Sequence, residues 1–187
     1  IADDFDNDGY IDLVVSEFHP SEPIRYFHND RDGTFSERTE EAGLIGLNGG
    51  PNLVQADYDN DGNVDFLALR GAWGAKEGRP PNSLIRNRGD GTFEDVTFDA
   101  GLGEVHYPTK TASWADYDND GNLDLYVGNG SLANLPSPGQ LFLNNGDGTF
   151  TDVAPAAGVT NDRLTKAVIW GDFNADLCPD LYVSNLD

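Results

Sequence analysis

One nine-residue pattern, D-x-D-x-D-G-x-x-D, constrains this chain of 187 residues more than any other feature. Intact copies begin at Asp4, Asp57 and Asp116, and an imperfect copy, DFNADLCPD, begins at Asp172. The copies recur roughly every 57 residues, an interval typical of supersecondary units that stack on copies of themselves. Any fold predicted for the chain must therefore repeat at this interval.

Two further landmarks keep the same order and spacing within each unit. They are Asp-Gly-Thr-Phe segments that end at Phe35, Phe93 and Phe150, and Ala-Gly-Leu or Ala-Gly-Val segments that start at Ala42, Ala100 and Ala157. Three landmarks in a fixed order do not arise easily by chance, so the unit is interpreted as a structural repeat.

Each unit is expected to contain four short strands, A to D. In the third unit the candidates are 112–115, 123–127, 140–144 and 149–153, which are rich in strand-forming residues. The Asp pattern joins A to B, and Asp147-Gly148 is predicted to make a tight two-residue hairpin between C and D. No segment has the sustained period of an amphipathic helix. An all-β fold of β-propeller blades, each with four antiparallel strands, is therefore predicted; a β-sandwich would not repeat its loops so regularly.

The landmarks also divide the chain into blades of a single repeat array, 1–187. Propellers close with about 4–8 blades, so the chain is expected to be part of a larger propeller or to complete its sheets with further blades or subunits. It starts at Ile1 rather than methionine, which indicates a processed form or a fragment. The expected units are a partial blade at 1–46, complete blades at 47–105 and 106–163, and a partial blade at 164–187.

The aspartates at positions 1, 3, 5 and 9 of the pattern predict calcium sites. Calcium takes about six to eight hard oxygen ligands, and the backbone carbonyl of position 7 would add one more. Glycine at position 6 permits the sharp bend. Without a cation the clustered carboxylates would repel one another. The predicted ligands are Asp4, Asp6, Asp8, Asp12 and the carbonyl of Tyr10; Asp57, Asp59, Asp61, Asp65 and the carbonyl of Asn63; and Asp116, Asp118, Asp120, Asp124 and the carbonyl of Asn122.

The imperfect fourth loop has Leu177 where the other loops have glycine. A leucine resists the backbone conformation that glycine adopts freely, so weak metal binding or none is expected there. The candidate ligands are Asp172, Asn174, Asp176, Asp180 and the carbonyl of Cys178.

An EF-hand is excluded at these loops. That motif needs a bidentate glutamate at loop position 12 and flanking helices. Position 12 is Val15, Ala68 or Val127 in the three intact loops, and each lies in an expected strand. The pattern therefore indicates a calcium loop within a β-structure.

With these motifs, the sequence resembles the FG-GAP/VCBS repeat family, which builds the propeller of integrin α-subunit heads. The resemblance rests on the Asp loop followed by Leu-Tyr-Val-Gly-Asn (125–129) and on Asn-Asn-Gly-Asp-Gly-Thr-Phe (144–150), and it extends over nearly the whole chain. It implies a seven-bladed propeller in the full protein, with calcium in the A–B loops. This chain holds about half of those blades. Members include adhesion receptors and surface proteins, so the family alone does not define a function.

The charge and hydropathy of the chain limit the classes of partner and the cellular locations that are expected. Thirty-three acidic residues face eleven basic ones, for a formal net charge of −22. Such a chain repels phosphate backbones, which argues against nucleic acid as a partner. No apolar run reaches the ~18 residues of a membrane helix. Extracellular calcium modules bind with affinities of about 10⁻⁴–10⁻³ M, so an extracellular, cell-surface or periplasmic location is expected.

A protein or glycan partner is expected on the face opposite the calcium loops. Strand polarity places the A–B loops and C–D turns at one end of each blade and the B–C and D–A loops at the other. In integrin-like propellers, which the sequence resembles, that second face contacts ligands. Its candidate anchors are Trp73, Lys76 and Arg79 in the B–C loop 71–81, and His106 and Tyr107 in a D–A loop.

These features favour a non-catalytic, calcium-binding adhesion or binding module. Catalysis would need a nucleophile or an acid–base set outside the repeat pattern. The histidines His19, His28 and His106 show no such spacing, and His28 is assigned to a repeat position that Arg86 and Asn144 also occupy. Two alternatives stay open: a structural subunit of a larger surface assembly or filament, favoured by exposed sheet edges, and a non-catalytic part of a secreted enzyme.

Overall fold

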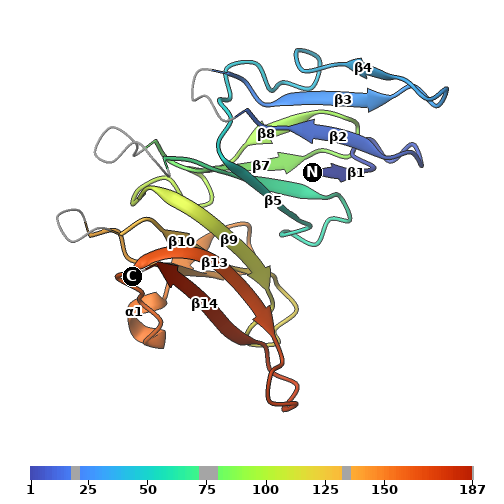
Figure 1. Ribbon diagram of the computed structural model, residues 1–187. Coiled ribbons are helices and arrows are strands. Elements are labelled where there is room, and N and C mark those ends of the chain that lie inside the picture. Colours follow the sequence, from blue (N-terminus) through green and yellow to red (C-terminus); the bar gives the residue numbers. More distant parts are fainter. Residues whose placement is uncertain (18–21, 72–79, 132–135, 187) are drawn as a thin grey trace.

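Four antiparallel sheets follow one another along the chain (Figure 1). The computed structural model describes residues 1–17, 22–71, 80–131 and 136–186. Within each sheet the strands pair in chain order, as in a meander. The predicted all-β class with four-stranded blades is confirmed. The sheets are β1 (Ala2–Asp3), β2 (Asp12–Val15), β3 (Arg25–Asn29) and β4 (Phe35–Glu37); β5 (Asn52–Ala56), β6 (Asp65–Leu69), β7 (Ser83–Asn87) and β8 (Phe93–Asp95); β9 (Thr109–Ala115), β10 (Asp124–Asn129), β11 (Gln140–Asn144) and β12 (Phe150–Asp152); and β13 (Leu164–Gly171) with β14 (Asp180–Leu186).

The sheets are arranged as successive blades. β9 contacts both β5 and β13, which are the first strands of the neighbouring sheets, and Figure 1 shows these three strands side by side. The short helix α1 (Ala154–Ala157) follows β12 and precedes the last sheet. No helix in the described part of the chain is long and apolar enough to cross a membrane.

The strand β6 shows why the inner blades lack the alternation of polar and apolar residues expected for a half-buried sheet. All five of its residues are buried, because the second blade is covered on both faces. Phe66 and Ala68 pack toward the first blade, whereas Leu67 and Leu69 pack toward the third. By contrast, Tyr182 on the last sheet is 60% exposed. The core is thus a series of apolar layers between blades.

The two shorter landmarks of the sequence meet across the blade boundary. The carbonyl of Ala42 accepts a hydrogen bond from the N–H of Phe93 in the next blade (2.9 Å), and the carbonyl of Ala100 accepts one from Phe150 (2.9 Å). Gly101 follows with a φ of 78°, and a Cβ there would lie 3.3 Å from the carbonyl oxygen of Phe150. The glycine is required both by its positive φ and by the close approach of the next blade.

The turn between β11 and β12 differs from the predicted two-residue hairpin. It comprises residues 145–149 and is closed by a hydrogen bond from Asn145 N–H to the carbonyl of Thr149 (2.9 Å). The positive φ angles belong to Gly146 and Gly148, whereas Asp147 uses its carboxylate to accept the N–H of Thr149 (3.1 Å). The hairpin between strands C and D is present, since β11 pairs with β12, but the prediction of a two-residue turn was wrong. Asp147 stabilises the turn through its side chain rather than through a left-handed backbone.

Candidate metal centres

The first aspartate of each A–B loop closes the turn with both carboxylate oxygens. In the first loop, Asp4 Oδ1 accepts the backbone N–H of Asp8 (2.9 Å) and Asp4 Oδ2 accepts that of Gly9 (2.8 Å). Because both bonds lie within nine consecutive residues, the shape of the loop is encoded locally. The same two bonds recur from Asp61 and Gly62 to Asp57, from Asp120 and Gly121 to Asp116, and from Asp176 and Leu177 to Asp172.

The backbone at loop positions 4 and 6 is left-handed. In the second loop, Asn60 has a φ of 59° and Gly62 a φ of 89°, and the first and third loops share this pattern. Asparagine tolerates this region better than most residues and glycine adopts it freely. The Asn-x-Gly part of the pattern is therefore a requirement of the turn.

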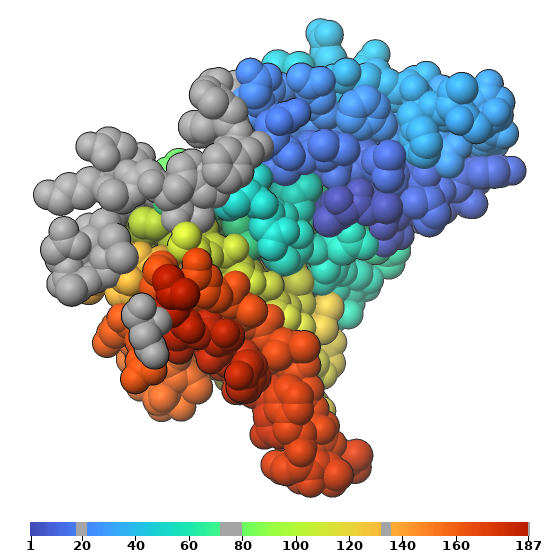
Figure 2. Space-filling view, viewed as in Figure 1, coloured from blue at the N-terminus to red at the C-terminus, as the bar shows by residue number. Residues whose placement is uncertain are grey.

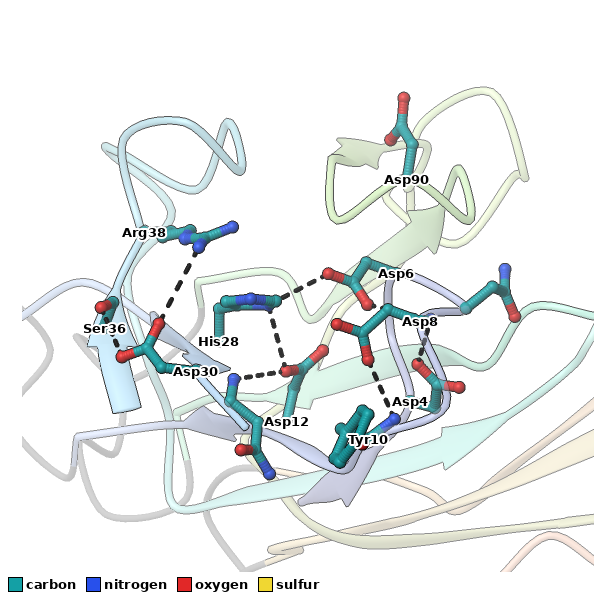
Figure 3. A network of polar contacts seen from close by, with 12 residues as sticks. Asp4, Asp6, Asp8, Tyr10, Asp12, His28, Asp30, Ser36, Arg38 and Asp90 are labelled. Atoms are coloured by element: carbon teal, nitrogen blue, oxygen red, sulfur yellow. Dashed lines mark hydrogen bonds and ion pairs between the residues drawn. The ribbon is translucent and has the colours of Figure 1, made fainter. Parts of the chain in front are cut away.

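This turn gathers the carboxylates of each intact loop. The contributing oxygens of each group lie within 4.8 Å of one another, and Figure 3 shows the first group around its loop. In the described residues Asp12, Asp65 and Asp120 do not join these groups, so the complete ligand sets remain predictions. The groups are Asp4, Asp6 and Asp8; Asp57, Asp59 and Asp61; and Asp116, Asp118 and Asp124.

The aspartate at position 9 has a structural role that the sequence did not reveal. Asp124 is fully buried; its Oδ1 accepts the N–H of Asn144 at the end of β11 (2.8 Å), and its Oδ2 accepts the N–H of Tyr117 in the loop (3.1 Å). Asp65 makes the equivalent bonds to Asn87 and Tyr58. This carboxylate ties the A–B loop to strand C, and the asparagine that ends each strand C is the signal that could have identified the contact.

The second and third loops are electrostatically unfavourable without a cation. Burial raises the pKa of Asp65 to about 8 and that of Asp124 to about 6. Burial, followed by repulsion from Asp61, also raises the pKa of Asp59. Asp59 Oδ1 is buried and has no hydrogen-bond partner. An unpaired buried carboxylate oxygen is costly, and a hard divalent cation such as calcium would satisfy it. The residues present therefore fit a calcium ion.

The fourth loop keeps the turn although it lacks the glycine. Leu177 takes a φ of 70°, which is strained for a leucine, and its side chain is 85% exposed. The backbone N–H of Leu177 lowers the pKa of Asp172. Cys178 is exposed, and its N–H donates to Asp176 (2.9 Å). Figure 2 shows the tip of the β13–β14 hairpin, which carries this loop, projecting from the body of the molecule.

Replacing Leu177 with glycine is expected to add one bound calcium ion per chain. The substitution removes about 1–2 kcal/mol of left-handed strain and sacrifices little packing, because the side chain is exposed. Calcium stoichiometry by isothermal titration checks this, with Gly62→Leu as the reverse control in the second loop. A variant with unchanged stoichiometry would show that Asn174 or Cys178, rather than Leu177, limits the fourth site.

Two basic residues of the first blade reach the first loop, and no pattern in the sequence indicated either contact. Arg31, from the C–D turn, forms an ion pair with Asp8. His28 Nδ1 lies 3.0 Å from Asp6 Oδ2. The structure also corrects the assignment of His28 to a repeat position shared with Asn144. Because Asn29 and Asn144 make the same bond to the position-9 aspartate, the residues equivalent to His28 are Arg86 and Leu143.

Asparagine at position 4 connects the loops of adjacent blades. Asn7 Nδ2 donates to Asn63 Oδ1 in the second loop (2.8 Å), and Asn60 Nδ2 donates to the carbonyl of Gly121 in the third (3.1 Å). These bonds join residues more than fifty positions apart, so no local pattern could have predicted them. They place the Asp loops of the first three blades in one continuous row.

Three of the five predicted anchors of the partner face lie outside the described residues. Trp73, Lys76 and Arg79, together with His19, fall outside the described residues. His106 precedes β9, and its Nδ1 lies 3.3 Å from the carbonyl oxygen of Gly103. The structure thus locates the Asp loops but leaves the opposite face as a prediction.

The family of the chain follows from its repeats. A family model described as an FG-GAP-like repeat matches residues 4–68, 71–127 and 131–183, which together cover most of the chain. The chain belongs to the FG-GAP-like repeat family. Each match ends within the second strand of a sheet, β6, β10 or β14, so the FG-GAP-like repeat recurs in register with the blades.

Curated relatives share part of this FG-GAP-like array. Over 109 residues, or 57% of the chain, the sequence is 32% identical to cartilage acidic protein 1 of Homo sapiens and 31% identical to that of Xenopus tropicalis. The match spans only 16% of the length of each relative.

A solved structure has a similar architecture. This structure is that of an Agrocybe aegerita lectin that recognises non-reducing terminal N-acetylglucosamine. The structural alignment covers 96% of this chain and 44% of the lectin chain, with a TM-score of 0.50. The sequence identity of 22% means that the similarity concerns the fold alone.

Proposed function

We propose that this FG-GAP-like chain is a non-catalytic, calcium-binding propeller module that acts outside the cell and binds a protein or a glycan. The intact Asp loops hold cations, with calcium in the second and third, and the bound ion ties strand A to strand B and, through the position-9 aspartate, to strand C. The blades thereby present the opposite face as a stiff surface. That face, with the B–C and D–A loops, is the proposed binding surface.

The observation that carries the calcium proposal is the buried Asp59 Oδ1, which has no hydrogen-bond partner although it lies in a group of three carboxylates. A solvated acidic turn would leave this oxygen exposed to water. A basic side chain could satisfy Asp59 Oδ1 by donating a hydrogen bond to it. Arg86, however, donates to Glu94 (2.8 Å). A bound divalent ion is the simplest partner for an oxygen in this position.

The binding role draws its support from the relatives and from the exposed surface. The lectin with a similar fold recognises a terminal sugar, so a glycan is one proposed ligand class. A stiff propeller face with variable loops suits a protein ligand equally well. The extracellular location rests on the relation to cartilage acidic protein 1 and on the weak affinity of calcium sites in extracellular modules.

The binding proposal is tested by applying the untagged chain to a glycan array and to immobilised extracellular matrix proteins, in calcium and in chelator. We expect calcium-dependent binding to at least one ligand. Substitution of Trp73 by alanine should weaken this binding by about tenfold or more while leaving the calcium-dependent melting unchanged. Retained binding in the Trp73→Ala variant would show that the binding surface lies elsewhere. An absence of binding to every glycan and matrix protein would favour a structural subunit.

The structural alternative has a specific observation in its favour. The last sheet has no described neighbour on its outer face, and Ile169 and Tyr182 expose 54% and 60% of their surface there. Apolar side chains of this kind suit a further blade or a second subunit. A seven-bladed propeller, completed by blades beyond this array, is the proposed arrangement of the full protein.

A further inference from the structure

The first Asp loop differs from the other two intact loops because an arginine side chain already pairs with one of its aspartates. Arg31 donates from Nη2 and Nε to Asp8 Oδ2, with the Nε contact at 3.1 Å. The residues equivalent to Arg31 are Gly89 and Gly146, which have no side chain to make such a bond. Position 5 of the first loop is therefore a poor calcium ligand compared with positions 5 of the second and third loops.

A buried histidine faces the remaining carboxylates of this loop. His28 is 8% exposed, and its Nδ1 lies 3.0 Å from Asp6 Oδ2 and 3.5 Å from Asp12 Oδ1. Neither contact has the direction of a hydrogen bond, so Nδ1 is a buried nitrogen without a hydrogen-bond partner. Figure 3 shows the ring facing both carboxylates. The equivalent residues, Arg86 and Leu143, cannot supply a ligand nitrogen.

The distances from His28 Nδ1 to the two carboxylate oxygens match the separation of neighbouring ligands in a metal coordination shell. Ligands about 2.0–2.2 Å from a zinc-like ion lie roughly 3.0–3.5 Å from one another. The two distances from His28 Nδ1 fall at these values. Asp6, Asp12 and His28 also form one of the groups whose ligand atoms lie within 4.8 Å of one another.

We propose that Asp6, Asp12 and His28 form a site for a divalent transition metal of the zinc class, with water completing the shell. One imidazole and two carboxylates suit zinc, cobalt or manganese, whereas calcium selects oxygen ligands. The proposal rests on the proposed cation-binding role of the Asp loops and extends it. The first loop selects a different metal from the second and third loops because Arg31 removes one oxygen ligand and His28 adds a nitrogen.

The test uses cobalt as a spectroscopic substitute for zinc, in untagged protein held at saturating calcium. The wild type is expected to bind one cobalt ion with visible absorption bands typical of a low-coordinate site, and zinc should displace it. The variants His28→Leu and His28→Arg, which copy the third and second blades, are expected to lose about 100-fold or more in zinc affinity. Even outer-shell partners of metal ligands contribute about 10–100-fold.

Two controls distinguish loss of the proposed metal site from an effect of removing any histidine and from misfolding of the variants. His106→Leu removes a histidine outside the Asp loops and should leave cobalt binding unchanged. The calcium-dependent shift in melting temperature, measured without cobalt, should persist in both His28 variants, which shows that they fold and that calcium binding is a separate property. Equal cobalt binding by the wild type and both His28 variants, or no cobalt binding by the wild type, would overturn the proposal.

Discussion

Removal of calcium is expected to lower the melting temperature of this protein by roughly 10–20 °C. A ligand present at one hundred times its Kd stabilises the folded state by about 2.7 kcal/mol per site. For a chain of this size each kcal/mol corresponds to about 2–4 °C. The second and third loops alone therefore account for the expected shift. Differential scanning calorimetry in calcium and in chelator, at equal ionic strength, measures it.

The variant Asp59→Asn is the matched test of the mechanism behind this shift. It keeps the size of the side chain but removes the buried charge whose pKa is raised, so calcium should lose about half of its stabilising effect. In chelator the variant is expected to melt no lower than the wild type, because a costly buried charge has been removed. Magnesium should give a smaller shift than calcium. Equal melting temperatures in calcium and chelator for the wild type would refute the calcium assignment.

The variant Asp124→Ala is expected to lose about 2–6 kcal/mol of stability even in chelator. Its carboxylate is fully buried and accepts backbone N–H groups from Asn144 and Tyr117. Removing it leaves two donors unsatisfied, at about 1–3 kcal/mol each. This loss arises from the link between the A–B loop and strand C rather than from the metal. Urea unfolding in chelator measures it as a change in the free energy of unfolding.

The exposed Asp120, a predicted ligand, provides the contrast. Its Oδ1 accepts the backbone N–H of Asn122 (2.8 Å) and its Oδ2 accepts a hydrogen bond from the side-chain Nδ2 of the same residue (3.0 Å). Both contacts are local and exposed, so Asp120→Ala should cost about 1 kcal/mol or less in chelator and reduce stability chiefly in calcium. Asp124→Asn keeps one acceptor oxygen and should fall between the two alanine variants. If Asp120→Ala and Asp124→Ala were equally destabilised in chelator, the position-9 carboxylate would have no separate structural role.

Much of the architecture was predictable because its determinants are local. The turn that begins at Asp57 satisfies its donors within nine residues, so the pattern alone indicated the loop. The strand after it, β6, is a short apolar run bounded by polar residues, and periodicity without helical spacing identified its type. The repeat interval then predicted blades, since a unit of this kind buries its apolar faces only against its neighbours.

The sequence by itself determined the all-β class, the repeated blade and the candidate calcium ligands, because each depends on residues close together in the chain. Only the tertiary structure showed that Phe93 bonds to Ala42, that Asn7 reaches Asn63, and that His28 and Arg31 alter the first loop. These contacts join strands or blades that are distant in sequence. Their geometry is set by how the sheets pack, and side-chain packing of that kind leaves no periodic signal in a single sequence.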